Sequence, residues 1–166
     1  MRKTAIIVLI TLFSLGSVTP SFAWEIESKT DDFGSKVAYA STYFMPGVGN
    51  TDSFDTAYDN GAYNRLIIRC QDKTLEIFIT DSENLFTTGS ALVRFGSGSP
   101  KKWSTSLSTD KEAFFFSSPK TLAASLTKIS KFYVRASGAS GYITANFNTG
   151  GLANHRALFK RTGCTF

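Results

Sequence analysis

The sequence predicts an α+β fold: a mainly antiparallel β-sheet with two short helices and one disulfide. Short runs of alternating apolar and polar residues predict the strands, and two segments with apolar residues at helical spacing predict the helices. The 15 phenylalanines favour strands further, because aromatic residues fit a half-buried pleated surface. The two cysteines, Cys70 and Cys164, are expected to form the disulfide, because the N-terminal residues indicate export to an oxidising compartment.

The N-terminal residues indicate export. Basic residues at positions 2–3 precede an apolar run over residues 5–15, and small residues, Ser21 and Ala23, stand three positions and one position before an expected cleavage point. Cleavage after Ala23 makes Trp24 the first mature residue. The apolar run is short for a bilayer, so we expect no stable membrane span after cleavage; an uncleaved N-terminal anchor is the alternative. The expected location is the periplasm.

An isolated cysteine pair in an oxidising compartment favours a disulfide between Cys70 and Cys164, whereas a redox or nucleophilic thiol is the alternative. Removing 23 of 166 residues leaves 143, a single-domain length over residues 24–166. Within it, 24–64 reads as an N-terminal strand and long loop, and 65–166 as a β-rich core with a C-terminal helix. The mature chain has 16 basic and 13 acidic residues, a surplus of +3 that gives no reason to expect a nucleic-acid partner.

Alternation is clearest in two neighbouring runs, 65–70 and 74–80, which predict a hairpin across the turn at 71–73. Further strands are expected at 37–44, 90–95, 112–116, 131–136 and 142–148. Residues 24–36 read as an edge segment or extended entry, and the glycine- and asparagine-containing stretch 45–64 reads as a long loop.

Two helices are expected. Ser118 offers an N-cap and Pro119 a first helical residue, which predicts a helix over 119–129. A second helix is expected over 151–161, with Gly163 at its C-terminal stop and Cys164 directly after. The expected disulfide would then tie this last helix to the strand that contains Cys70.

The sequence predicts no catalytic constellation, no cofactor and no metal. Its single histidine, His155, has no G-x-S-x-G element to partner it, and one histidine with two oxidised cysteines cannot supply a usual zinc site. Asp52, Asp55 and Asp59 lack EF-hand spacing, which favours a polar loop over an irregular calcium site. Paired carboxylates of a glycoside hydrolase depend on spatial separation, so the sequence leaves that alternative open. We expect a non-enzyme.

Three arginines, Arg69, Arg94 and Arg135, each stand inside an expected strand on the more polar face. Should those strands be neighbours, the guanidinium groups would form a basic strip able to engage carboxylates or phosphates. The competing interpretation, which we favour, is an ordinary solvated sheet face with cross-strand charge pairs, for example with Glu76.

The order of several short motifs resembles the type VI secretion accessory proteins called VasI or TagO. The matching features are Ile68-Arg69-Cys70, Val93-Arg94-Phe95, Trp103 followed by Ser108-Thr109-Asp110 and Ala113, and Phe147 before Gly151-Leu152 and a terminal Cys164. The resemblance covers about residues 63–166. Gly96 stands where the family has an acidic residue, and the spacing from Trp103 to Asp110 is longer than usual in it. The resemblance implies a periplasmic, non-enzymatic accessory role through protein contacts.

We therefore expect an exported accessory or binding protein with an envelope or secreted protein as its partner. The candidate contact residues are Arg69, Arg94, Trp103, Asp110 and Arg135, although a tryptophan such as Trp103 is more often core. The main alternative is an immunity or phage-exclusion factor that blocks a toxin, enzyme or phage component with the loop at 47–61. An envelope hydrolase is the least favoured hypothesis. The oligomeric state cannot be read from the sequence.

Overall fold

A computed structural model describes residues 24–30, 34–43, 65–81, 85–139 and 141–166. The expected signal peptide and the loop at 45–64, with its three aspartates, lie outside the described residues. In the described part of the chain, no helix is long and apolar enough to cross a membrane.

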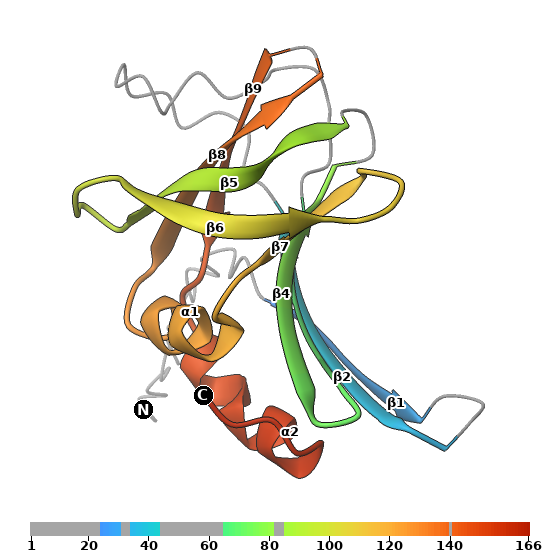
Figure 1. Cartoon of the computed structure of the whole chain (residues 1–166). Helices are drawn as coiled ribbons and strands as arrows, with labels where there is room; N and C mark the ends of the chain where they lie inside the picture. The colour runs from blue at the N-terminus through green and yellow to red at the C-terminus, as the bar shows by residue number, and fades with distance from the viewer. Residues whose placement is uncertain (1–23, 31–33, 44–64, 82–84, 140) are drawn as a thin grey trace, which may run out of the picture.

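The architecture is the predicted α+β class, with nine strands among the described residues in one antiparallel sheet (Figure 1). The sheet order is β1-β2-β3-β4-β7-β6-β5-β8-β9. The strands are β1 (Glu25–Thr30), β2 (Lys36–Tyr43), β3 (Arg65–Gln71), β4 (Thr74–Thr80), β5 (Phe86–Phe95), β6 (Lys101–Leu107), β7 (Ala113–Phe116), β8 (Lys131–Gly138) and β9 (Gly141–Asn148).

The sheet bends strongly: β5 and β6 run across the view in Figure 1, whereas β4, β2 and β1 run downward beneath them. The strands β7 and β6 connect the two halves, and the bend brings β9 close to β2. Phenylalanine rings fill the space between the halves: Phe86 and Phe116 both pack edge-on against Phe114, with ring centroids 4.6 and 5.1 Å apart. The bend therefore gives the protein an inner, apolar side and an outer, more polar side.

The β3–β4 hairpin follows the predicted alternation. Leu66, Ile68 and Cys70 are fully buried, and Ile68 lies opposite the equally buried Ile77. The turn places Asp72 and Lys73 at positive φ, 50° and 63°, a left-handed conformation that the hairpin twist favours.

The first helix is shorter than predicted and begins differently. The helix α1 (Pro119–Leu126) starts at Pro119 as expected, but Ser118 has a left-handed conformation and its side chain makes no capping hydrogen bond. The helix ends at Leu126 rather than at Ile129, and the C-cap residue Thr127 donates its amide to the Ala123 carbonyl and its hydroxyl to the Ala124 carbonyl. Its apolar side is nevertheless buried, with Leu122 inaccessible to solvent.

The predicted helix over 151–161 is two pieces, the 3-10 helix η1 (Leu152–His155) and the helix α2 (Arg156–Arg161). Leu152 and Phe159 are fully buried, one from each piece. Gly163 ends α2 at φ 94°, as the sequence predicted. Its lack of a side chain also matters, since a Cβ there would lie 2.7 Å from Cγ of Lys73.

Candidate functional site

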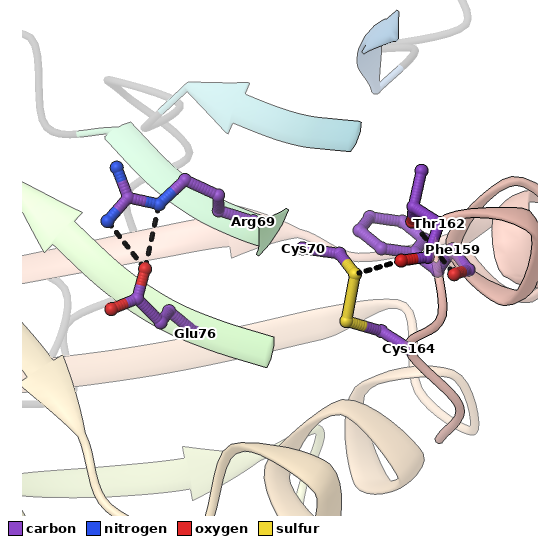
Figure 2. The surroundings of a disulfide bond; sticks show 6 residues. All are labelled: Arg69, Cys70, Glu76, Phe159, Thr162 and Cys164. Carbon is purple, nitrogen blue, oxygen red and sulfur yellow. Dashed lines mark hydrogen bonds and ion pairs between the residues drawn. A yellow bond between two sulfur atoms is a disulfide. The ribbon is translucent and has the colours of Figure 1, made fainter. Parts of the chain in front are cut away.

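The disulfide joins Cys70 of β3 to Cys164, with the two Cα atoms 6.0 Å apart (Figure 2). Both cysteines are buried, and the Thr162 carbonyl oxygen lies 3.5 Å from Sγ of Cys70. The amide of Cys164 donates to the Phe159 carbonyl, which closes the chain back onto α2. The prediction that the bridge ties the terminal helix to this strand is confirmed, and both cysteines of the chain are used in it.

Arg69 lies on the outer side of β3, in an ion pair with Glu76 of β4 (Figure 2). Its Nε donates to Oε2 of Glu76 at 2.7 Å, and its guanidinium carbon lies 5.3 Å from the centre of the Phe78 ring. Both charged side chains are about one-third exposed, at 29% and 33%. The cross-strand pairing with Glu76 that the sequence favoured is therefore present.

Arg94 and Arg135 are neighbours on a different part of the outer side. Arg94 of β5 lies opposite Tyr133 of β8, with its guanidinium 4.0 Å from the centre of that ring. Arg135 also belongs to β8, two residues along, and its Nε donates to Oγ1 of Thr144 at 3.4 Å. The strands β4, β7 and β6 separate these two arginines from Arg69. A single strip of all three is wrong, because β5 does not pair with β4.

Trp103 lies on the side of β6 that faces the core. It packs against the buried cluster, its ring centre is 6.0 Å from that of Phe95, and its indole N–H donates to the Ser117 carbonyl at 2.8 Å. Lys101 lies over the same ring, with Nζ 5.1 Å from the centroid. Trp103 is therefore a partly buried structural residue, and part of its side chain stays exposed to solvent.

Asp110 organises the turn between β6 and β7. Its Oδ1 accepts hydrogen bonds from the hydroxyl of Ser108 and from the amide of Glu112. The Ser108 hydrogen bond, followed by the Glu112 amide, lowers the pKa of Asp110 below its ordinary value. The turn also holds Lys111 at φ 64°. Asp110 is therefore held by its own turn rather than aimed at a neighbouring element.

The sequence did not indicate a hollow of about 290 Å³ on the outer side of β1 to β4. It is lined by Glu25, Ile26, Glu27, Lys29, Tyr39, Ser41, Arg65, Ile67 and Phe78, a set that we call the outer hollow. Ile67 and Phe78 are cross-strand partners at its apolar part, and Phe78 also contacts Phe115 with ring centres 4.8 Å apart.

Arg65 anchors the polar part of the outer hollow. Its Nη2 donates to Oγ of Ser41 at 2.6 Å and forms an ion pair with Glu25. Tyr39 lies beside this group, with the ammonium of Lys29 5.4 Å from its ring centre. The alternation of residues 65–70 predicts Arg65, Ile67 and Arg69 on one face, as the structure has them. The sequence did not indicate that β1 would extend the same face.

The described residues contain no group of three or more histidine, cysteine, aspartate or glutamate side chains suited to hold a metal ion. His155 ends η1, on a different element from the strands that line the outer hollow. The lining of the outer hollow offers apolar contact, aromatic contact and charge-assisted hydrogen bonding.

No protein-family model, curated protein or solved structure matches this chain. The resemblance to the VasI or TagO accessory proteins stays a prediction that rests on its short motifs.

Proposed function

We propose that this chain is an exported, non-enzymatic binding protein that acts through protein contacts in the cell envelope, with the outer hollow and the adjoining Arg69 as its contact surface. One observation supports this proposal most directly: one face of the sheet presents arginine side chains together with Tyr39, Ile67 and Phe78. Aromatic residues and arginine are the types that dominate binding energy at protein interfaces.

The arginines of this surface support the proposal because neighbouring groups already hold them in place. Arg65 is held by Glu25 and Ser41, while Arg69 is held by Glu76 over Phe78. A side chain fixed before binding loses less conformational entropy when the partner arrives. The strands beneath also provide a rigid base, unlike a contact surface made of loops alone.

Export supports the envelope as the place of action. The first 23 residues have the order of charged, apolar and small residues that secretory signals use, and a disulfide persists in an oxidising compartment. The motif order shared with the VasI or TagO proteins makes a type VI secretion component the first partner to test. An immunity or phage-exclusion role is the alternative, in which the partner is foreign.

The test compares three forms of the mature protein as bait in envelope extracts, with captured proteins identified by mass spectrometry. Tyr39→Ala removes an aromatic ring of the outer hollow, and Tyr142→Ala, on the exposed end of β9, is the matched control. We expect one partner to be captured by the wild type and by Tyr142→Ala, and to bind Tyr39→Ala about tenfold more weakly or worse. Equal capture by all three forms would overturn the assignment of the surface, and capture of a foreign component would favour immunity.

A further inference from the structure

The first strand of the described sheet is unusually open to solvent. β1 ends the strand order and pairs with β2 along its whole length, from Glu25 opposite Ser41 to Thr30 opposite Lys36. All six of its residues are exposed, among them Ile26 at 38%. A second hollow, of about 330 Å³, lies between β1 and α2, and Ser28 and Thr30 of β1 line it. A strand edge of this kind is a template for another strand.

The charges of β1 indicate which strand fits. On its outer side they run Glu25, Glu27 and Lys29, from the start of the strand to its end. Glu25 is already engaged by Arg65, whereas Glu27 and Lys29 form an ion pair with one another at 3.4 Å, with more than half of each side chain exposed. An antiparallel copy of the same strand reverses this order and brings unlike charges together.

We infer that β1 pairs antiparallel with β1 of a second copy of this chain, about a twofold axis that is perpendicular to the sheet at Ser28. Residues opposite one another in an antiparallel pair share a face, so Glu27 then lies opposite Lys29 of the other copy, twice by symmetry. Ile26 lies opposite Thr30 in the inner row. The outer faces of the two copies become one continuous face, and the two outer hollows lie on it side by side.

The neighbouring register is less favourable for reasons visible in the same strand. Centring the pair on Glu27 places that carboxylate opposite its own copy, and it requires Glu25 to leave Arg65 in order to meet Lys29. Like charges directly opposite one another destabilise a strand pair. The register centred on Ser28 avoids both costs.

Pairing between two copies of the chain is measured on purified protein without any other partner, so this test is independent of the proposed function. Sedimentation velocity over about 1 µM to 1 mM covers the weak range expected for an interface that is mainly one strand pair. Four variants are compared with the wild type: Lys29→Glu, Glu27→Lys, the double exchange Glu27→Lys with Lys29→Glu, and Lys102→Glu. The last changes an exposed lysine of β6, away from the edge, by the same charge.

Each single variant places two like-charge pairs across the axis, so we expect the dimer dissociation constant to rise about tenfold or more. The double exchange restores unlike pairs and should return it to within about threefold of the wild type, as should Lys102→Glu. Substitutions on an exposed strand leave the fold intact, which denaturation midpoints will verify. A monomer at every concentration would overturn the inference and identify the charges as protection of the edge. Failure of the double exchange to restore the dimer would overturn the register.

Discussion

Breaking the disulfide should cost this protein a large share of its stability. The bridge joins residues that lie 94 positions apart in the 166-residue chain, so it closes a long loop. In the chain-entropy model a loop of this length stabilises the folded state by about 4.7 kcal/mol at 25 °C, and native disulfides typically contribute about 2–5 kcal/mol. Whole domains have only about 5–15 kcal/mol of unfolding free energy, so reduction should shift the denaturation curve strongly.

The assay is guanidinium denaturation of the oxidised protein and of the same protein held reduced. Reduction keeps both sulfur atoms in the protein, whereas Cys70→Ala with Cys164→Ala would remove two buried side-chain atoms and add the cost of the cavities. A fall in unfolding free energy of less than about 1 kcal/mol would refute the loop-closure reasoning.

Reduction should also act locally. α2 has six residues, and a helix of that length is not stable without tertiary contacts. We expect the amides of residues 156–164 to exchange with solvent faster in the reduced protein than those of β3, because Cys164 is a main tie between this segment and the sheet. Equal protection of the two segments would show that the buried Phe159 is sufficient.

Four further predictions follow from the packing and the charges. Phe114→Ala should lower the unfolding free energy by about 3–5 kcal/mol, since this ring is 2% exposed and contacts two other rings; calorimetry measures it, and a loss below about 1 kcal/mol would contradict the packing. Trp103→Phe should cost about 1 kcal/mol through the lost hydrogen bond to Ser117, and an unchanged denaturation midpoint would show that this bond contributes nothing. Arg69→Met should cost about 0.2–1 kcal/mol after allowance for solvent screening, less at high salt; a loss independent of salt would point to packing on Phe78 instead. Because the pKa of Asp110 is lowered in the folded state, its contribution is fully present above the ordinary value of 3.8 and is lost as pH falls through the lowered pKa, so Asp110→Asn should make stability less acid-dependent than in the wild type; identical pH profiles would refute this.

The sequence predicted best those elements whose signal is local. The β3–β4 hairpin alternates cleanly, and Pro119 and Gly163 mark helix ends by their restricted or permissive backbones. β6 was not predicted because Lys101–Leu107 is mostly serine and lysine, residues with little strand preference, and it is held in the sheet by β5 and β7 on either side. Ser118 failed as a cap because its backbone is left-handed.

The candidate surface depended on pairings between distant segments. Placing Arg69 beside Arg94 required the order of the strands, and β4 pairs with β7 rather than with β5. The outer hollow needed β1, whose sequence Glu-Ile-Glu-Ser-Lys-Thr has a single apolar residue and therefore no clear strand pattern. Residue types alone could indicate arginines and aromatics suited to binding, but not which of them share a face.

The most direct test of the central claim is hydrogen exchange on the captured partner complex, compared with the free protein. The outer hollow as contact surface predicts new protection in the amides of 25–30 and 36–43, and little change in 141–148 of β9. Protection confined to β8 and β9, around Arg94 and Arg135, would contradict the claim and move the binding surface to the other half of the sheet.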